Sequence, residues 1–221
     1  MKKVLLAAIC AALIATSGFV NVNIDHWTHF PTAYSEVVTK DRGLFSTTYH
    51  INMKNEIKDT DSVKNILKVL QTARSNDKIV FHLAGFGGQV DTVAAIINNA
   101  NESKAHIETR VEAPVYSGHA FLAALLPNLH VDKYAYLMFH YSSILNQPAC
   151  ALSDGWDRGV SNVEHCQMFR DAHIKMFNKM LNDCKYLTEE EKINIITGHD
   201  VYLHSDDIEK RQGVLYKLGA K

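Results

Sequence analysis

The stretch Ile79-Val80-Phe81-His82-Leu83-Ala84-Gly85-Phe86-Gly87-Gly88 is the centre of the predicted fold. It begins as a short apolar run and ends in a loop rich in glycine. Beyond the loop, apolar residues recur at the spacing of one helix face, at Val90, Val93, Ala94 and Ile97. The sequence therefore predicts a strand over 79–83, a glycine loop, and a helix that begins directly after the loop.

The next segment predicts a second and a third strand. Every second residue from 107 to 115 is apolar or a threonine, and charged residues stand between them over 108–112, which indicates a strand. This strand runs into Tyr116-Ser117-Gly118-His119, where a second helix is expected to begin. An apolar run over 136–139 then ends at His140. The order predicts an α/β fold with two right-handed crossovers on a parallel sheet.

Weaker patterns extend this unit in both directions. A first strand is expected over 47–53, and a helix over 63–70 follows the capping oxygens of 59–62. Residues 142–159 resemble a loop, and a long helix is expected from Val163 to Cys184. A capping box at Thr188 predicts another helix, which Gly198 would end. A strand over 201–203, a helical turn or two that Gly213 stops, and a final strand over 214–218 complete the prediction.

The N-terminus has the layout of a secretory signal peptide. Lys2-Lys3 precede an apolar run from Val4 to Ala15, and small residues follow at Thr16-Ser17-Gly18. An uncleaved anchor or a buried helix is the alternative. We expect a signal or membrane segment over 1–18 and one domain over 19–221. The protein would then be exported, to a periplasm or the exterior, or attached to a membrane; it would be cytoplasmic if the segment is not a signal.

Several residues carry groups suited to acyl transfer. Ser117 lies where a strand gives way to a helix, so its hydroxyl would be near the positive end of the helix dipole. The amide of Gly118 and one from the Gly87-Gly88 loop are placed to bind an oxyanion. Ser117, His140 and Asp200 follow one another in a chain order that a catalytic triad permits. Each of these features also has a simpler explanation. Ser117 could be a helix cap and the Gly87-Gly88 loop a tight turn. His140 could be a structural histidine, and Asp200 an acidic loop residue.

Other chemistries find less support. The glycine loop lacks the third glycine of a dinucleotide fingerprint, no Walker lysine follows it, and Ser117 lies outside a Gly-x-Ser-x-Gly elbow. No cofactor or metal is predicted, because the 12 histidines include no His-Glu-x-x-His pattern. His165, Cys166 and His173 could share a helix face, where a surface or core role is the simpler explanation. A formal net charge of −1 without a basic stripe argues against nucleic acid as a partner.

Cleavage of the signal after Ser17 would leave the thiols of Cys150, Cys166 and Cys184. A Cys150–Cys166 disulfide would join the long loop to the long helix in an oxidising compartment. Three unpaired thiols are the open alternative.

From Ile79 to Leu218 the chain resembles the proteolytic subunit of the Clp protease, in the Clp protease and crotonase-like superfamily. Gly85-Phe86-Gly87-Gly88-Gln89-Val90 is similar to that family's Ser-Pro-Gly-Gly loop. Val115-Tyr116-Ser117-Gly118-His119-Ala120-Phe121-Leu122 resembles its Ala-Ala-Ser-Met-Gly-Ala-Phe-Leu segment, and Met138-Phe139-His140-Tyr141 its Met-Ile-His-Gln-Pro segment. Gly198-His199-Asp200 and the residues that follow keep the order of its acid segment. Tyr116, Gly118 and Tyr141-Ser142 depart from the family pattern.

The resemblance implies repeated ββα units with a protruding handle helix, and a serine endopeptidase that works through an acyl-enzyme. Ser117 would be the nucleophile, His140 the base and Asp200 the residue that orients it. The amides of Gly88 and Gly118 would form the oxyanion hole, and Gly87 and Gln89 would contact a peptide or unfolded protein. Two alternatives stay open: a crotonase-like acyl-CoA enzyme, and an inactive Clp-like assembly or binding protein.

The resemblance also implies partners. Relatives in this family form stacked heptameric rings, so a homo-oligomer is expected here. Cytosolic relatives work with an ATP-driven unfoldase, but an exported protein would meet no ATP. We therefore expect activity on short or unfolded peptides without an unfoldase.

Overall fold

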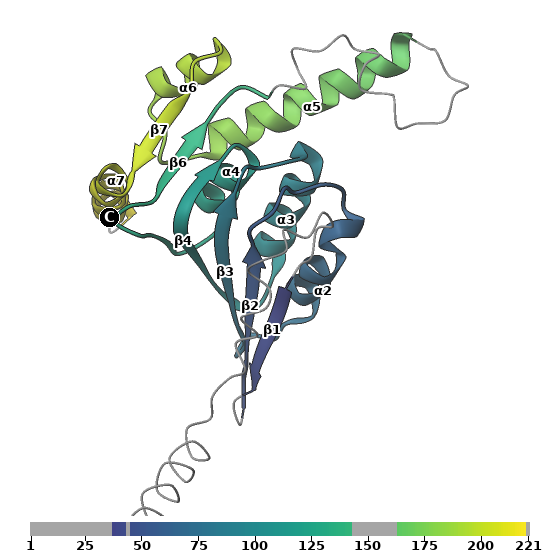
Figure 1. The fold of residues 1–221 in the computed structure, drawn as a ribbon, viewed down its shortest axis with the longest axis vertical. Helices are drawn as coiled ribbons and strands as arrows, with labels where there is room; N and C mark the ends of the chain where they lie inside the picture. The colour runs from purple at the N-terminus through teal and green to yellow at the C-terminus, as the bar shows by residue number, and fades with distance from the viewer. Residues whose placement is uncertain (1–36, 43–44, 143–162, 220–221) are drawn as a thin grey trace, which may run out of the picture. The chain divides into compact units, whose positions relative to one another are not determined.

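A computed structural model of the chain describes residues 37–42, 45–142 and 163–219. The chain divides into residues 1–33 and 34–221, and every described element belongs to the second unit. The described residues form a mixed α/β unit with a 7-stranded sheet and six α-helices (Figure 1). This confirms the predicted α/β class. No helix of the described part is long and apolar enough to cross a membrane.

The strands are β1 (Val37–Arg42), β2 (Thr47–Met53), β3 (Lys78–Gly85), β4 (His106–Tyr116), β5 (Leu129–Val131), β6 (Tyr136–Phe139) and β7 (Val201–His204). Their order in the sheet is β1-β2-β3-β4-β6-β7, and β5 also pairs with β4. Strands β2 to β6 pair in parallel, whereas β1 and β7 pair antiparallel at the two edges.

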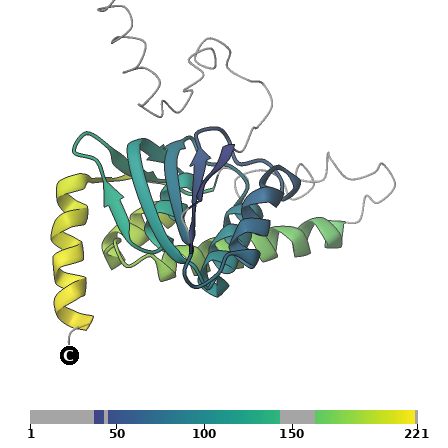
Figure 2. The same ribbon diagram turned by 90° about the horizontal axis from the view of Figure 1, so that it is seen from below.

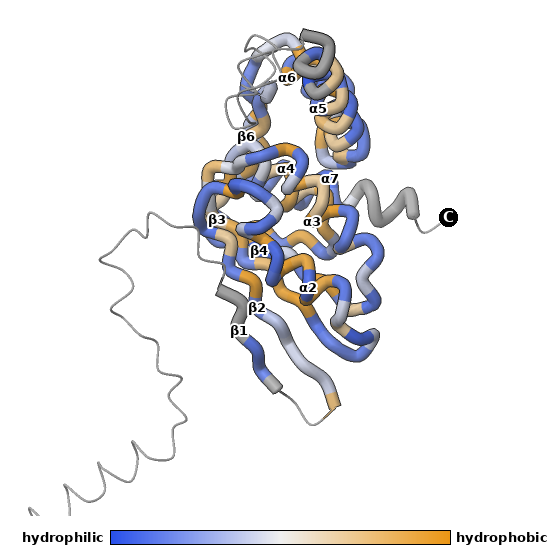
Figure 3. Tube along the Cα trace, turned by 90° about the vertical axis from the view of Figure 1, so that its right-hand side faces the viewer, coloured by the Kyte–Doolittle hydropathy of each residue, from blue (hydrophilic) through white to orange (hydrophobic). Residues whose placement is uncertain are grey.

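The helices are α2 (Lys64–Thr72), α3 (Val90–Glu102), α4 (Gly118–Leu125), α5 (Val163–Asp183), α6 (Glu189–Ile196) and α7 (Ser205–Gly219). Helices α2 to α5 lie on one side of the sheet (Figure 2). Hydrophobic stretches of the inner strands and of the helices beside them lie close together (Figure 3), and their buried side chains form one core. Burial of these apolar side chains is the main favourable contribution to folding.

The alternation along β4 explains why one face of the sheet is covered. Ile107, Val111 and Val115 are buried beneath the helices, while Arg110 and Glu112 on the other face are exposed. Strand β3, in the middle of the sheet, is buried from Ile79 to Phe81, while His82 is partly buried and pairs with Glu112 of β4. The predicted strands and helices of this central unit are therefore confirmed, from β3 through α3, β4 and α4 to β6.

The flanking predictions hold except at the C-terminus. The structure contains the predicted β2, α2, α5, α6 and β7, and Thr188 and Glu191 form the expected capping box at the start of α6. Two strands, β1 and β5, were not predicted. Strand β5 has only three residues, too few for a periodic pattern to appear in the sequence.

The predicted final strand over 214–218 is wrong. Helix α7 continues through Gly213 to Gly219 without a break. A glycine inside a helix costs only about 1 kcal/mol relative to alanine, so it does not by itself end a helix. The short apolar run after it cannot be assigned to a strand by pattern alone, because runs of this length also occur on helices.

Some predictions lie outside the described residues. These are the signal or membrane segment over 1–18, most of the expected loop over 142–159, and the Cys150–Cys166 disulfide. Cys184, just beyond α5, is a buried free thiol, and burial raises its pKa to about 11.

Candidate functional site

Ser117 occupies a strained turn between β4 and α4. Its backbone has φ 54° and ψ −124°, and Asn128 is the only other non-glycine residue of the described part with a positive φ. The Ser117 N–H donates to the Met138 carbonyl at 2.8 Å, and its carbonyl accepts from the Phe121 N–H at 3.1 Å. These bonds hold a conformation that costs about 1–3 kcal/mol, and such conformations cluster at functional sites.

The Ser117 hydroxyl does not cap helix α4. The side chain accepts no hydrogen bond from the first turn of the helix. The simpler explanation of this serine, a helix N-cap, is therefore excluded by the structure. Its hydroxyl remains available at the sharp strand-to-helix turn.

The glycine loop after β3 lies directly against this turn. Gly87 has φ 101°, and a Cβ placed on it would lie 2.6 Å from the Ser117 Cβ and 2.7 Å from the Gly118 nitrogen. Gly88 has φ 148° and also cannot accept a side chain, because a Cβ there would collide with the Ile57 carbonyl. Only glycine permits both the torsions and the close approach at these two positions. The fold thus joins two segments that lie 30 residues apart in sequence.

The Gly88 nitrogen lies beside the Ser117–Gly118 turn. The Gly87 carbonyl accepts from the Ile57 N–H at 2.7 Å, and the described part of the chain has no cis peptide. In a trans peptide the N–H is opposite to the C=O, so the Gly88 N–H points away from Ile57. A Cβ on Gly118 would lie 3.2 Å from the Gly88 nitrogen, which places the two residues in contact.

Neither the Gly88 nor the Gly118 N–H has an acceptor within the described residues. Polar groups at buried or half-buried positions normally have partners. Two adjacent amides without acceptors, beside a serine hydroxyl, match the donor arrangement that stabilises an oxyanion.

Strand pairing brings the other two predicted residues to the same end of the sheet. Strand β6 pairs with β4 through Tyr116 and Met138, and Ser117 follows directly. Strands β6 and β7 end their antiparallel pairing at Phe139 and Val201, so His140 and Asp200 come next on adjacent strands. His140 is half-buried and Asp200 is exposed. Among the described residues, no hydrogen bond joins the side chains of Ser117, His140 and Asp200.

His119 is a residue of this site that sequence reasoning missed. Its side chain is fully buried, and its Nδ1 accepts a hydrogen bond from the Gly87 N–H at 2.9 Å. Burial lowers the pKa of His119 to about 4, and the nearby Met53 backbone only partly opposes this shift. Nε2 makes no hydrogen bond of normal geometry within the described part. A histidine directly after the Ser-Gly pair was the signal that could have identified it.

Of the two residues predicted to contact a substrate, Gln89 is accessible and Gly87 is not. Gln89 is exposed and precedes α3 without capping it. Gly87 is buried, and its N–H and C=O are bound to His119 and Ile57.

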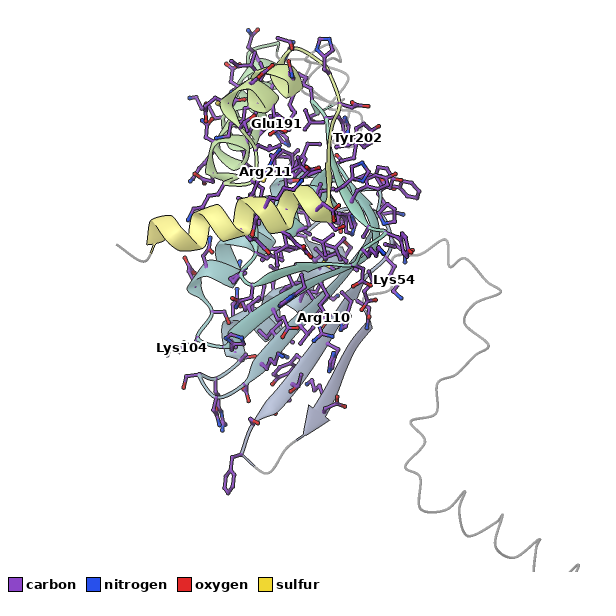
Figure 4. The ribbon with its side chains drawn as sticks, turned by 90° about the vertical axis from the view of Figure 1, so that its left-hand side faces the viewer. Lys54, Lys104, Arg110, Glu191, Tyr202 and Arg211 are labelled. Carbon is purple, nitrogen blue, oxygen red and sulfur yellow. The ribbon has the colours of Figure 1, made fainter. Side chains whose placement is uncertain are left out.

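A row of aromatic side chains borders the glycine loop and the serine turn. Phe86, directly before Gly87, is 79 % exposed and stacks on Tyr116 with ring centroids 5.3 Å apart. The Tyr116 and Tyr136 hydroxyls are hydrogen-bonded at 2.6 Å, and the Tyr136 ring contacts Tyr202. Tyr202, on β7, is half-exposed (Figure 4). The hydrogen bond to Tyr116 raises the pKa of Tyr136. This aromatic row presents apolar surface next to Ser117.

An ion pair between α6 and α7 supports the segment that carries Asp200. The Arg211 guanidinium donates two hydrogen bonds to the Glu191 carboxylate, at 2.7 and 2.9 Å (Figure 4). Burial favours a raised pKa for Glu191, but hydrogen bonds from Arg211 and Thr188 lower it overall. Because α6 precedes Asp200 and β7, and α7 follows them, this pair holds the two ends of that segment together.

The many histidines raise the question whether the chain could hold a metal ion. Within it, no group of three His, Cys, Asp or Glu side chains is arranged to hold a metal ion. Of the three residues considered on α5, His173 is buried, and the side chains of His165 and Cys166 lie outside the described residues.

No protein-family model matches the sequence, and no curated protein matches it. The geometry of the site is therefore the basis for a functional proposal.

Proposed function

We propose that the protein is a serine endopeptidase with a Clp protease or crotonase-like fold, and that Ser117 is its nucleophile. The observation that carries the proposal is the contact between the Gly87-Gly88 loop and the Ser117–Gly118 turn. At this contact the Ser117 hydroxyl, which does not cap helix α4, lies next to the Gly88 and Gly118 amides, which have no acceptor within the described residues. Acyl transfer uses this pairing of nucleophile and oxyanion donors.

In the proposed reaction, the Ser117 Oγ attacks the carbonyl carbon of a peptide bond. His140 takes the hydroxyl proton and later gives it to the leaving amine, and Asp200 orients the imidazole. The carbonyl oxygen becomes an oxyanion that accepts hydrogen bonds from the Gly88 and Gly118 amides. Water then hydrolyses the acyl-enzyme, with the same histidine as the base.

The triad must close when substrate binds. Within the described residues, no hydrogen bond holds the His140 or the Asp200 side chain in another arrangement. Catalytic hydrogen bonds are often long or absent in unliganded enzymes and form in the substrate complex. The positions of both residues at the ends of β6 and β7 support this assignment.

The aromatic row supports a peptide or an unfolded protein as the substrate. Phe86 stacks on Tyr116, the residue before Ser117, and exposed Tyr202 extends the same row, where apolar side chains of an extended peptide would pack. Exposed Gln89 can hydrogen-bond the same peptide. We expect cleavage beside large apolar residues.

We further propose that the chain forms a homo-oligomer of the heptameric-ring type, with α5 as the handle. If residues 1–18 direct export, the enzyme acts without an ATP-driven unfoldase. Detection of an intact N-terminus on mature protein in a cytosolic fraction would contradict the export part of this proposal.

The proposal is tested with a fluorophosphonate probe, which reacts with activated serines. We expect labelling of the parent and none of Ser117→Ala, and a similar loss for His140→Ala, because nucleophile and base act as one unit. Asp200→Asn should fold and assemble normally while kcat falls by about 10⁴, as in triads where the tautomer of the base is lost. Peptidase activity in Ser117→Ala close to that of the parent would rule out the mechanism.

A crotonase-like acyl-CoA enzyme is the second candidate. The absence of a hydrogen bond between the described Ser117, His140 and Asp200 side chains favours it, because that chemistry needs the two amides and not the serine. It predicts that Ser117→Ala retains turnover of an acyl-CoA thioester while fluorophosphonate leaves the parent unlabelled.

A further inference from the structure

His119 is a fully buried histidine beside the candidate site that the proposed reaction does not use. Its ring packs against Gly85, where a Cβ would lie 3.0 Å from the His119 Cε1 and 3.3 Å from Nε2. The absence of a side chain at Gly85 therefore makes room for the imidazole. The ring contacts the glycine loop from β3 on one side and belongs to the serine turn on the other.

The hydrogen bond from the Gly87 N–H determines the tautomer of the His119 imidazole. An amide N–H can only donate, so the Nδ1 that accepts it at 2.9 Å carries no proton. The neutral ring then has its proton on Nε2. Burial disfavours the charged form and keeps the pKa of His119 at about 4, so the acceptor persists at neutral pH.

Gly87 is held from both sides. His119 accepts from its N–H, and the Ile57 N–H donates to its carbonyl at 2.7 Å. Glycine samples many torsions when it is unrestrained. The first bond holds the Phe86–Gly87 peptide and the second holds the Gly87–Gly88 peptide, so together they fix the torsions of Gly87. Those torsions set the direction of the Gly88 N–H relative to the Ser117 turn.

We propose that His119 is a positioning residue of the oxyanion hole, which holds Gly87 through Nδ1 so that the Gly88 N–H faces the oxygen of the reacting carbonyl. This inference rests on the proposed function. It concerns transition-state stabilisation alone, because His119 has no exposed surface with which to touch a substrate.

Three substitutions separate this role from simple packing. His119→Asn keeps an acceptor near the place of Nδ1, whereas His119→Leu removes the acceptor and keeps an apolar side chain of similar bulk. If His119→Leu does not fold, His119→Gln replaces it. The glutamine amide oxygen lies one bond farther from the backbone than the asparagine oxygen, so it does not occupy the place of Nδ1. His130→Leu, at an exposed position on β5, is the matched control.

The assays measure kcat and KM for a peptide substrate, the rate of fluorophosphonate labelling, and the affinity of a peptide boronate that mimics the tetrahedral adduct. Loss of one oxyanion donor costs about 10²–10³ in kcat, and a loosened donor should cost less, about 10–100-fold. We expect kcat, the labelling rate and the boronate affinity of His119→Leu to fall by this factor, while KM stays nearly unchanged. His119→Asn should recover most of it, and His130→Leu should match the parent.

Labelling of His119→Leu or His119→Gln at the parent rate would overturn the inference and leave the proposed function standing. An equal loss in His119→Asn and His119→Leu would also overturn it, because packing and not the acceptor would then be responsible. A parent protein that resists labelling to the same extent as Ser117→Ala would overturn the proposed function, and this inference with it.

Discussion

At the scale of single residues, His119 shows how burial sets chemistry. Its ring is inaccessible to solvent, and it lies beside backbone groups of Gly85, Gly87 and Met53. No charged side chain of the described part contributes to the shift of its pKa from 6.5 to about 4. The neutral ring is therefore a consequence of desolvation, and it makes the fold sensitive to acid.

We predict that the free energy of unfolding decreases as the pH falls from about 6.5 to about 4. In this window the unfolded chain protonates His119 and the folded chain does not, so the unfolded state binds more protons. The loss amounts to roughly 3 kcal/mol across the window. Urea unfolding at several pH values measures it, and His119→Asn should lack this component. An identical pH dependence in the parent and in His119→Asn would contradict the prediction.

Gly88 carries the second residue-scale prediction. A Cβ there would overlap the Ile57 carbonyl, and its φ of 148° strains any other residue. We expect Gly88→Ala to lower the free energy of unfolding by about 3 kcal/mol or more. Gly198→Ala is the control, because φ is 91° but no atom lies within 4 Å of the added methyl. It should cost about 1 kcal/mol, and equal costs in both variants would refute the collision argument.

At the scale of secondary structure, Gly213 tests the helix that replaced the predicted strand. It lies within α7, is exposed, and has open space where an alanine methyl group would stand. We expect Gly213→Ala to stabilise the protein by up to about 1 kcal/mol, because alanine favours the helix. Urea midpoints and far-ultraviolet circular dichroism measure the change. Destabilisation with reduced helix content would instead favour a helix that ends at Gly213.

At the scale of the whole molecule, the proposed assembly depends on helix α5. Its C-terminal half packs on the core through His173, Phe177, Met180 and Leu181, which are all buried. Toward its N-terminal end the helix projects from the sheet, and Met168 is 63 % exposed (Figure 1). Met168 is therefore the exposed apolar side chain of α5 at which the proposed assembly can be tested.

We therefore predict an oligomer by light scattering at micromolar concentration, and a smaller species for Met168→Glu because a buried charge is costly at an interface. Lys179→Glu, near the end of the packed half, serves as a charge-changing control that should leave the assembly intact. A monomeric parent protein would refute the ring proposal and leave the catalytic proposal to be tested by itself.

The sequence by itself determined the order and type of the central elements. Alternation along 107–115 and the helical spacing after Gly88 arise from burial of one face, and burial leaves a period in the sequence. The capping-box motif identified Thr188 as a helix cap, because capping depends on residues that are close along the chain. Ser117, His140 and Asp200 were proposed from residue type, chain order and the resemblance of their segments to a known family.

Only the tertiary structure decided what surrounds those residues. That Ser117 caps nothing, that Gly87 meets Gly118, and that His119 accepts from Gly87 all depend on contacts between segments far apart in sequence. Such contacts leave no local period, because they are set by strand pairing and by where a side chain is absent. The continuation of α7 through Gly213 has the same origin: a local cost of about 1 kcal/mol is small beside the packing of the whole fold.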